Sequence, residues 1–334
     1  MQIAFFEVEE WEKEYIKSEL PKNAEVLFFS EKLAIETVAQ AKDCAVISTF
    51  IDSQITPAII VALPNLKMIA TRSTGFDHID MQSCGERKIK VCNVPSYGEN
   101  TVAEHTFALL LTLSRKVYDS VEAVKKEGFS IKGFRGFDLA GKTLGIIGMG
   151  NIGQHVARIA QGFEMKIVVV DIKQDKKLAK KLGFKYLTLE ELLKNADIVT
   201  LHVPYNEHTH HLINASNIML MKKSAYLINT ARGGIIETNA LVKALDNGVL
   251  AGAALDVLEE ECFIKEEGQL LSEEFYKKCD IKTMLQNHIL MDRKNVIITP
   301  HNAFNSREAL ERILETTVES IHAFNMGKPV NAVS

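Results

Sequence analysis

Residues 143–153, which read TLGIIGMGNIG, decide the fold. Their apolar first half predicts a buried strand, and the glycines that follow, Gly148, Gly150 and Gly153, form the pattern G-x-G-x-x-G. A helical pattern comes next, and the following apolar run ends at Asp171, close to the spacing of about 20 residues that dinucleotide-binding units show. Strand, glycine turn, helix and acid in this order predict a Rossmann unit that binds a dinucleotide.

The chemistry of a dinucleotide explains each part of this motif. Gly148 permits the tight turn, Gly150 lets backbone N–H groups approach a pyrophosphate, and Gly153 lets the helix pack on the sheet. The helix N-terminus then faces the anion. Asp171 can accept a ribose 2′-hydroxyl but would repel a 2′-phosphate, and residues 172–174 contain no arginine to compensate, so the motif favours NAD over NADP. The alternative is a glycine turn without a ligand and an aspartate on the surface.

Strand and helix patterns alternate along the rest of the chain. Short β-branched runs separated by helical stretches are typical of a parallel sheet covered by helices. The predicted strands are 2–7, 25–29, 44–48, 68–71, 90–93, 143–147, 166–171, 198–203, 225–229 and 251–256.

This alternation predicts an α/β protein with two doubly wound parallel-sheet domains, a Rossmann NAD-binding domain inserted in a flavodoxin-like substrate domain. The substrate-binding (catalytic) domain is discontinuous and covers 1–98 and 300–334, and the NAD-binding domain covers 99–299. A helical rhythm at 99–126 predicts one long helix that links them, and a last helix is expected at 306–325.

The composition of the 334-residue chain excludes several classes of protein. Hydrophobic residues make up 46% and charged residues 25%, which rules out a disordered or fibrous chain. The formal net charge of −4 lacks the basic excess of a nucleic-acid binder. Uninterrupted apolar stretches such as 107–111 are far below the ~18 residues that span a bilayer, and the N-terminus does not resemble a signal peptide. Five cysteines without C-x-x-C spacing predict reduced thiols, so we expect a cytoplasmic protein without a metal site.

Polar residues stand at three predicted strand ends in the middle of the chain. Arg232 follows the strand at 225–229, an acidic run begins at Asp256 where the strand at 251–256 ends, and His301 follows the apolar run 296–299 and Pro300. Because an open α/β sheet keeps its ligand crevice at the carboxyl ends of its strands, these side chains could form a unit for ketone reduction. Taken singly, each also fits a simpler description: a helix-capping arginine, a solvated acidic run and a surface histidine.

A series of motifs extends over nearly the whole chain. They are the glycine turn, His202-Val203-Pro204, the segments 229–233, 254–261 and 299–301, and, before them, RSTGFDHID at 72–80 and VPSYGENTVAE at 94–104. In this order they resemble the signatures of the D-2-hydroxyacid dehydrogenases, and within that family the D-lactate dehydrogenase branch. The segments at 72–80 and 94–104 look like the family's substrate loop and hinge.

The resemblance implies a role for each residue of the site. Arg232 would bind the substrate carboxylate and polarise the keto oxygen, His301 would be the acid/base that protonates that oxygen, and Glu261 would hydrogen-bond His301. Backbone N–H groups of Thr74 and Gly75 would hold the carboxylate from the other domain. The positions that match pocket-lining residues are Tyr97 and Phe304. The positions that match cofactor contacts are Val102, Gly148, Gly150, Asn151, Ile152, Gly153, Asp171, His202, Val203, Pro204, Thr209, Thr230, Ala231, Arg232, Asp256 and His301.

The activity that the resemblance implies is reversible hydride transfer between NADH and pyruvate, which gives D-lactate. Arginine suits the carboxylate because its planar fork binds two oxygens at once. Histidine suits the proton because its ordinary pKa, about 6.5, lies near working pH. The family is usually dimeric, so we expect a homodimer.

Other functions stay open. One is another D-2-hydroxyacid dehydrogenase, acting on glycerate, hydroxypyruvate or bulkier 2-keto acids; another is phosphite dehydrogenase; a third, from a different class, is an NAD-sensing, corepressor-like binding protein. A phosphorylated substrate would need extra basic residues at the pocket, and the substrate loop offers only Arg72.

Two features depart from the simplest family pattern. The acidic run offers three consecutive glutamates, and Glu261 is chosen because it is fifth after Asp256. Residues 262–293 lengthen the interval before His301 and predict an elaborated loop near the mouth of the site, which puts the substrate scope in doubt.

The histidines at 208, 210 and 211 are expected in a solvated loop rather than at a metal.

Overall fold

The computed structural model describes residues 1–21, 24–261 and 280–333, and the chain divides into two compact units. Unit 1 contains Met1–Gly98 and Asn305–Ser334, and unit 2 contains Glu99–Phe304. The chain therefore returns from unit 2 to unit 1 after Phe304. The sequence predicts this boundary earlier, after residue 299. The reason is local: the backbone N–H groups of Asn302 and Ala303 donate to a carboxylate of unit 2.

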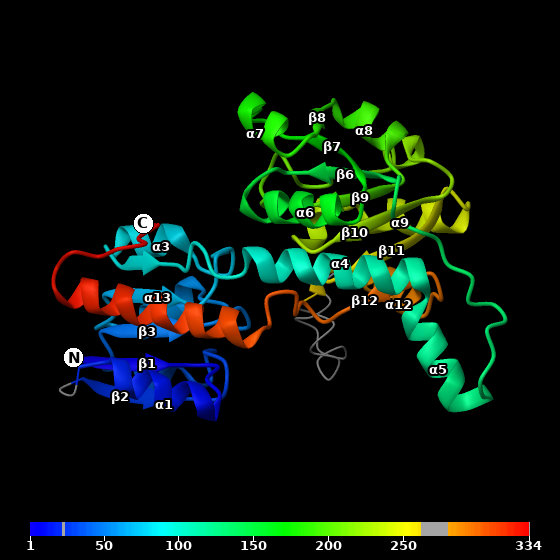
Figure 1. Ribbon diagram of the computed structural model, residues 1–334. Coiled ribbons are helices and arrows are strands. Elements are labelled where there is room, and N and C mark those ends of the chain that lie inside the picture. The colour runs from blue at the N-terminus through cyan, green and yellow to red at the C-terminus, as the bar shows by residue number, and fades with distance from the viewer. Residues whose placement is uncertain (22–23, 262–279, 334) are drawn as a thin grey trace. The chain divides into compact units, whose positions relative to one another are not determined.

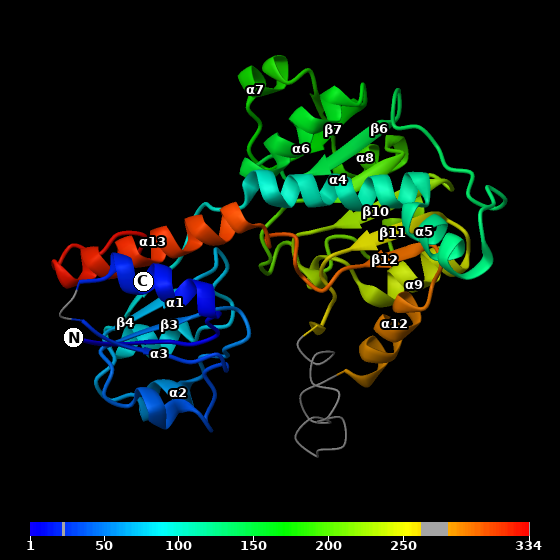
Figure 2. The same ribbon diagram turned by 60° about the horizontal axis from the view of Figure 1, so that its bottom comes forward.

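Unit 1 is built on a five-stranded parallel sheet in the order β2-β1-β3-β4-β5 (Figure 1). Its strands are β1 (Gln2–Phe5), β2 (Glu25–Phe28), β3 (Val46–Thr49), β4 (Met68–Thr71) and β5 (Lys90–Cys92). Its helices are α1 (Glu10–Glu19), α2 (Pro57–Ala62), α3 (Met81–Glu86) and α13 (Arg307–Asn325), with a 3-10 turn at Val38–Ala41. The helices α1 and α13 cover one face of the sheet, and α2 and α3 cover the other (Figure 2).

Unit 2 is built on a seven-stranded parallel sheet in the order β12-β11-β10-β9-β6-β7-β8. Its strands are β6 (Thr143–Ile147), β7 (Lys166–Val170), β8 (Lys185–Tyr186), β9 (Ile198–Leu201), β10 (Ala225–Asn229), β11 (Leu250–Leu255) and β12 (Val296–Ile298). Its α-helices are α4 (Glu99–Arg115), α5 (Val117–Glu127), α6 (Asn151–Gly162), α7 (Lys176–Lys181), α8 (Leu189–Asn195), α9 (Thr238–Asp246) and α12 (Ile281–Met291). Buried side chains of α4 and α6 pack on one face of the sheet, and those of α8 and α9 pack on the other.

Both strand orders are those of doubly wound folds. Unit 1 has the flavodoxin-like order, and the first six strands of unit 2 have the Rossmann order, extended by β12 at one edge. The strands β3, β4 and β9 are buried along their whole length, as their uninterrupted apolar or small side chains require. The predicted fold class is confirmed.

The strand ends of unit 2 lie in one row. Residues paired across the sheet are Val170, Ile147, Leu201, Asn229, Leu255 and Ile298, each the last residue of its strand. Because the sheet is parallel, the residues that come next in the chain lie along the same edge. This edge therefore collects the side chains predicted for the site.

The long helix expected at 99–126 is two helices, α4 and α5. Lys116 separates them with a left-handed backbone, φ 51°. The carbonyl oxygen of Ser114 accepts from the backbone N–H of Phe137, 2.9 Å away, so a segment distant in sequence takes the place of the next helical turn. Gly136 packs so closely on that oxygen that a Cβ would lie 2.1 Å from it.

The loop expected at 262–293 is in part a helix, since Ile281–Met291 form α12. Residues 262–279 lie outside the described part of the chain. Across 1–21, 24–261 and 280–333, no helix combines the length and the apolar run that crossing a bilayer requires.

Candidate active site

The turn between β6 and α6 has no room for a side chain at two of its three motif glycines. Gly148 has φ +96°, and a Cβ there would lie 2.4 Å from the carbonyl oxygen of His202. A Cβ on Gly153 would lie 2.1 Å from the Gly148 carbonyl oxygen. Gly150 faces open space, since nothing in the described chain lies within 4 Å of its Cβ position. Two glycines thus close the turn, and the third leaves the backbone open to a ligand.

The N-terminus of α6 is suited to an anion. This 12-residue helix has Gly150 as its N-cap, and in the described structure neither a capping side chain nor an acidic residue occupies its first turn. The first N–H groups of a helix have no intrahelical partner, and they carry the positive end of its dipole. A pyrophosphate fits this end of the helix.

Asp171 is fixed against the glycine turn at the end of β7. Its Oδ2 accepts from the backbone N–H of Met149 at 2.6 Å, and its Oδ1 accepts from that of Lys173 at 2.7 Å. A carboxylate has further lone pairs for the hydroxyls of a ribose, and its charge opposes a 2′-phosphate. The turn, the helix end and this carboxylate fit NAD.

His202 adds a buried polar atom to the same edge. Its Nε2 lies 2.9 Å from Thr200 Oγ1, and its Nδ1 is buried without a hydrogen-bond partner in the described chain. Burial lowers the pKa of His202 to about 3, so the ring is neutral at working pH. A neutral ring with one unused nitrogen fits a polar group of the cofactor better than it fits an ion pair.

The other residues matched to cofactor contacts lie on α4, at the start of α6 or just after β9 and β10. They are Val102, Asn151, Ile152, Val203, Pro204, Thr209, Thr230 and Ala231. Thr209 shapes its own loop, since its Oγ1 donates to Pro204 O at 2.6 Å. Thr230 Oγ1 lies 3.0 Å from Thr106 Oγ1 of α4. Their contacts with the cofactor stay predictions.

His301, in the connection after β12, pairs with Glu261. His301 Nδ1 lies 2.6 Å from Glu261 Oε1, and the second carboxylate oxygen accepts from the Leu258 backbone N–H at 3.1 Å. The side chains remain 19% and 31% exposed, so the pair is accessible. A carboxylate on Nδ1 fixes the ring orientation and leaves Nε2 as the nitrogen that exchanges a proton with a ligand.

Asp256 holds the peptide on which His301 lies. Its carboxylate accepts from Thr299 Oγ1 and from the backbone N–H groups of Asn302 and Ala303, and its carbonyl oxygen accepts from the His301 N–H at 2.8 Å. His301 has φ 52°, a left-handed conformation that costs a non-glycine residue about 1–2 kcal/mol. The hydrogen bonds to Asp256 offset this strain.

His105 of α4 completes the support around Asp256. Its Nε2 lies 3.2 Å from Thr299 Oγ1 and 3.5 Å from Asp256 Oδ1. Burial would raise the pKa of Asp256, but hydrogen bonds from His105, Thr299 and the backbone outweigh burial and lower it. The role of His105 could not be recognised from the sequence, because its partners Thr299 and Asp256 lie far away in the chain. The Asp256 side chain is fully buried among these donors, and its cofactor contact stays a prediction.

Arg232 lies in a turn that Asn229 shapes. Asn229 Nδ2 donates to Arg232 O at 2.8 Å, and Asn229 Oδ1 accepts from the Ala231 N–H at 3.0 Å. Gly233 then packs on the backbone of Leu258, where a Cβ would lie 2.0 Å from the carbonyl carbon. The half-buried Arg232 thus emerges at the same edge of the sheet as the Asp256 and His301 connections.

The three consecutive glutamates have different partners. Glu259 pairs with His211, whose Nε2 lies 2.6 Å from Glu259 Oε1. Glu260 accepts from a backbone N–H just before α12. Glu261 is the glutamate on His301, the pairing that the resemblance implies. The acidic run is therefore not a solvated face, and His211 is not simply part of a solvated loop.

The predicted substrate loop of unit 1 turns its carbonyl groups toward protein donors. Ser73 O accepts from Val94 N, Thr74 O accepts from Asn93 Nδ2, and Gly75 O accepts from Ser73 Oγ. In a trans peptide the N–H points opposite to the preceding carbonyl, so the N–H groups of Thr74 and Gly75 point away from these donors.

The two residues matched to the pocket wall belong to different units. Tyr97 of unit 1 is half-buried, and its carbonyl oxygen accepts from Arg312 Nε at 2.6 Å. Phe304, also half-buried, is the last residue of unit 2. Their substrate contacts stay predictions.

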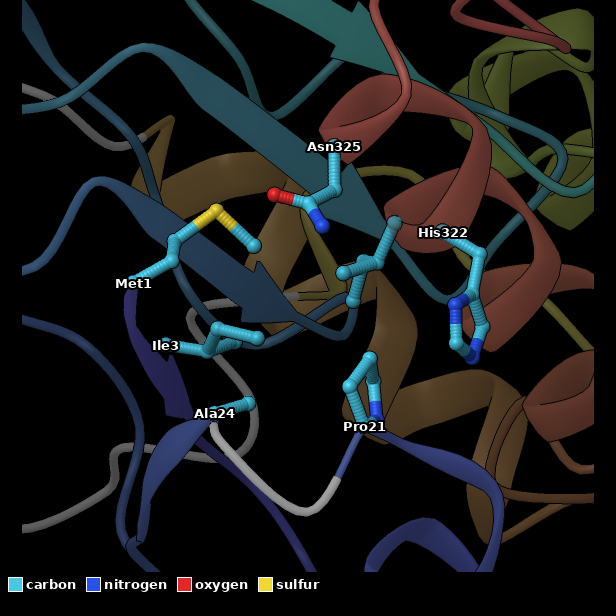
Figure 3. Close-up of a pocket in the computed structure, with 7 residues that line it drawn as sticks. Met1, Ile3, Pro21, Ala24, His322 and Asn325 are labelled. Atoms are coloured by element: carbon cyan, nitrogen blue, oxygen red, sulfur yellow. The ribbon is translucent and has the colours of Figure 1, made fainter.

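Unit 1 also has a hollow beside the end of α13 (Figure 3). It is lined by Met1, Ile3, Pro21, Ala24, Ile321, His322 and Asn325. His322 is engaged there with the fold, since its Nε2 lies 2.8 Å from Glu19 O. No lining residue belongs to the predicted site. In the described ranges no group of three or more His, Cys, Asp or Glu side chains could hold a metal ion.

Comparisons with known proteins agree on one family. Residues 107–303 match the family described as "D-isomer specific 2-hydroxyacid dehydrogenase, NAD binding domain". A D-lactate dehydrogenase from Aquifex aeolicus, solved with NAD and lactic acid, superposes with a TM-score of 0.85 at 37% identity, covering 98% of this chain and 96% of that one. A glyoxylate reductase from Pyrococcus furiosus is 36% identical over 97% of this chain and 87% of its own length. A 2-hydroxyacid dehydrogenase homolog from Zymomonas mobilis is 33% identical over 98% of both chains.

Proposed function

The chain belongs to the D-isomer specific 2-hydroxyacid dehydrogenases, and on that premise we propose that it is a D-lactate dehydrogenase, which reduces pyruvate reversibly with NADH. The coarser statement, an NAD-dependent 2-hydroxyacid dehydrogenase, follows from the family. The observation that supports the catalytic assignment is the pairing of His301 with Glu261 at 2.6 Å, at the strand edge where Arg232 also emerges.

His301 is the acid in this proposal. In reduction, negative charge grows on the keto oxygen, and the imidazolium donates its Nε2 proton to that oxygen. Glu261 accepts from Nδ1, so it holds the ring in place and balances its charge. In lactate oxidation the neutral ring takes the proton back. When bound, NAD supplies the hydride carrier at nicotinamide C4.

Arg232 binds the substrate carboxylate and polarises the keto oxygen. A planar guanidinium meets a carboxylate with two parallel hydrogen bonds, which fixes the orientation of a three-carbon acid. The same charge stabilises the oxyanion more in the transition state than in the ground state, so it contributes to kcat as well as to binding.

Thr74 and Gly75 provide N–H groups for the same carboxylate. The inward carbonyls of their loop support this role, because they leave the N–H groups directed away from the protein donors. Tyr97 and Phe304 line the pocket in this proposal and limit the length of the acyl chain.

Pyruvate is proposed ahead of other acids because the Aquifex aeolicus structure that resembles this chain is a D-lactate dehydrogenase with lactic acid. The similar Pyrococcus furiosus protein is a glyoxylate reductase, which makes glyoxylate the competing substrate. Both acids need the same arginine, acid and hydride chemistry, and they differ by one methyl group.

NADH consumption tests the proposal directly. The protein is assayed with pyruvate, glyoxylate, hydroxypyruvate and a branched 2-keto acid, and the product from pyruvate is analysed on a chiral column. We expect the highest kcat/KM for pyruvate and D-lactate as the product. A higher kcat/KM for glyoxylate would reassign the substrate within the family, and L-lactate would contradict the proposal.

We also propose that the enzyme is a homodimer that uses the outer face of α5. Four apolar or aromatic side chains of this helix are 47–64% exposed, and two more in the segment just after the helix are more than 90% exposed. They are Val117, Tyr118, Val121, Val124, Phe129 and Ile131. Exposed apolar side chains on this helix and just after it support a protein interface.

Light scattering after gel filtration tests the interface. Val121→Glu places a charge at its middle, and we expect a dimer in the wild type and a monomer in the variant. Val61→Glu changes a residue that is 75% exposed on α2 of unit 1 and serves as the control. A monomeric wild type, or a dimeric Val121→Glu protein, would contradict this use of α5.

A cytoplasmic location completes the proposal. It is supported by the free thiols of Cys44, Cys84 and Cys92, which are buried in unit 1 and have raised pKa values because of that burial. Such thiols suit a reducing compartment.

A further inference from the structure

A second histidine–carboxylate pair, His211 with Glu259, lies in unit 2 and has no part in the proposed chemistry. Its Nε2–Oε1 distance of 2.6 Å equals that of the His301–Glu261 pair. The Glu259 side chain is only 17% exposed and that of His211 is 32% exposed. A short charge-assisted contact with this degree of burial requires a structural or functional reason.

Glu259 is held on every side by protein donors. Its Oε2 accepts from Thr238 Oγ1 at 2.7 Å and from the Thr238 N–H at 3.2 Å, at the first turn of α9. Its carbonyl oxygen accepts from the fully buried Asn287 Nδ2 of α12 at 2.8 Å. The acidic segment that ends at Glu261 is therefore anchored to two helices through its first glutamate.

His211 is held to the turn that follows Arg232. Its N–H donates to Gly234 O at 2.8 Å, and its backbone is left-handed, with φ 48°. The His210 ring stacks on the His211 ring with 3.8 Å between centroids, and His210 Nδ1 lies 3.0 Å from the Tyr205 hydroxyl.

The two glycines after Arg232 are enclosed by the same groups. A Cβ on Gly233 would lie 2.3 Å from Glu259 N, and a Cβ on Gly234 would lie 2.8 Å from Cε2 of Tyr205. The Arg232 turn thus packs between the backbone of the acidic segment and the loop that carries His211. Within the described residues, the side-chain contact between His211 and Glu259 joins these two enclosing segments.

We propose that His211 and Glu259 are positioning residues, which lock the turn that carries Arg232 to the segment that carries Glu261. Arg232 and Glu261 come from the connections that follow two different strands. The distance between them therefore depends on the contacts that hold these two connections together, among them the contact between His211 and Glu259. The pair does not touch the substrate in this proposal. The inference deepens the proposed function, because it assumes that Arg232 and Glu261 serve the reduction of a 2-keto acid.

Hydrogen exchange tests the lock without any turnover. Glu259→Gln keeps the shape of the side chain and removes its charge, and Glu260→Gln makes the same change one residue later. We expect the rate of hydrogen exchange in residues 233–238 to rise about 5- to 10-fold in Glu259→Gln, because this variant loses one charge-assisted hydrogen bond. Exchange in β6 should not change, and Glu260→Gln should match the wild type throughout.

Kinetics of the same variants connect the lock to Arg232. We expect the KM for pyruvate to rise about tenfold in Glu259→Gln, with the affinity for NADH within about twofold of the wild type. His211→Asn, which tolerates the left-handed backbone, should show the same split. If Glu259→Gln does not fold, Thr238→Val takes its place, because it removes the hydroxyl donor to Glu259 and should show the same split. Thr238→Ser keeps the hydroxyl and should match the wild type.

Unchanged exchange in residues 233–238 of Glu259→Gln and His211→Asn would overturn the lock, whatever the enzyme reduces. Faster exchange with an unchanged KM for pyruvate would overturn the link to Arg232. A wild-type protein that reduces no 2-keto acid would instead defeat the proposed function, and the exchange result would still decide the lock.

Discussion

Arg72 and Arg232 both follow parallel strands, yet they differ in how deeply the side chain is buried and in which carbonyl groups it binds. Arg72 comes directly after β4 in unit 1 and is 2% exposed. Its Nη2 donates to the carbonyl oxygens of Phe6 at 2.8 Å and Glu7 at 2.6 Å. Arg232 comes after β10 in unit 2, is half-buried, and donates from Nη1 to the carbonyl oxygen of Ala231 at 2.8 Å.

The difference shows that a position at a strand end does not by itself make an arginine a ligand. Burial lowers the pKa of Arg72, and the nearby Glu12 and Glu7 partly oppose that effect. A guanidinium surrounded by carbonyl groups and carboxylates is part of the fold and has no access to a substrate. The one basic residue that the substrate loop offered to a phosphate is therefore unsuited to that role, which counts against phosphorylated substrates.

The largest effect is expected from replacing Arg72, and it should be a loss of stability. In Arg72→Met the carbonyl oxygens of Phe6 and Glu7 lose their buried donor, and we expect a loss of about 3–5 kcal/mol in the unfolding free energy of unit 1. Denaturant titration followed by hydrogen exchange in β1 and β4 measures it. NADH affinity, a property of unit 2, should not change.

If Arg72→Met does not accumulate as folded protein, Arg72→Lys keeps the charge on a single donor nitrogen, and its stability should fall between those of the wild type and Arg72→Met. A stable Arg72→Met protein with a raised KM for 2-keto acids would reverse the comparison and make Arg72 the ligand.

Arg232→Lys should have the next largest effect, and on activity alone. An ammonium group keeps the charge but lacks the planar fork, so we expect kcat/KM for pyruvate to fall about 10²- to 10³-fold. Thermal unfolding and the affinity for NADH should stay close to the wild type. Near wild-type turnover in this variant would remove Arg232 from the mechanism.

Glu261→Gln sharpens the comparison on the catalytic side. The amide fills the same space beside His301 but does not balance the charge of the imidazolium, so we expect kcat to fall about tenfold, or about 1.4 kcal/mol. Glu260→Gln is the matched control, and its steady-state rates should equal those of the wild type. Equal losses in the two variants would mean that the acidic run acts through its total charge and not through one pairing.

The sequence allowed the fold and the cofactor to be predicted because both depend on local patterns. Buried parallel strands need continuous apolar runs, and the turn at Gly148 needs a glycine whatever surrounds it. These constraints act within a few residues, so they are visible in the sequence.

The rest of the site depends on contacts between distant segments. Nothing near Arg72 in the sequence indicates that its guanidinium binds the carbonyl groups of Phe6 and Glu7, which follow β1. The neighbouring glutamates 259 and 261 look alike in the sequence, and only the fold assigns them to His211 and His301. The break at Lys116 likewise depends on a carbonyl group taken by a residue from another segment.

The smallest effect is expected at Glu12, the carboxyl group of α1 that faces Arg72. Burial raises the pKa of Glu12 above its ordinary value, although Arg72 and a hydrogen bond from the Glu9 N–H lower it. A group whose pKa is raised by folding contributes stability that is complete below its unfolded pKa and is lost as pH rises through its folded pKa. Glu12→Gln is neutral at every pH and accepts the same hydrogen bond.

The stability of the wild type relative to Glu12→Gln should therefore fall as pH rises above the ordinary carboxyl range, and the change should be smaller than the effects expected for the variants above. Thermal unfolding of both proteins at several pH values measures the difference. Glu10→Gln removes an exposed carboxylate from the same helix and controls for the charge of α1. If the stability of the wild type relative to Glu12→Gln instead increases as pH rises, the attraction between Glu12 and Arg72 exceeds the cost of burying the carboxylate. Arg72 would then be held mainly by an ion pair with Glu12 and not by the carbonyl groups of Phe6 and Glu7.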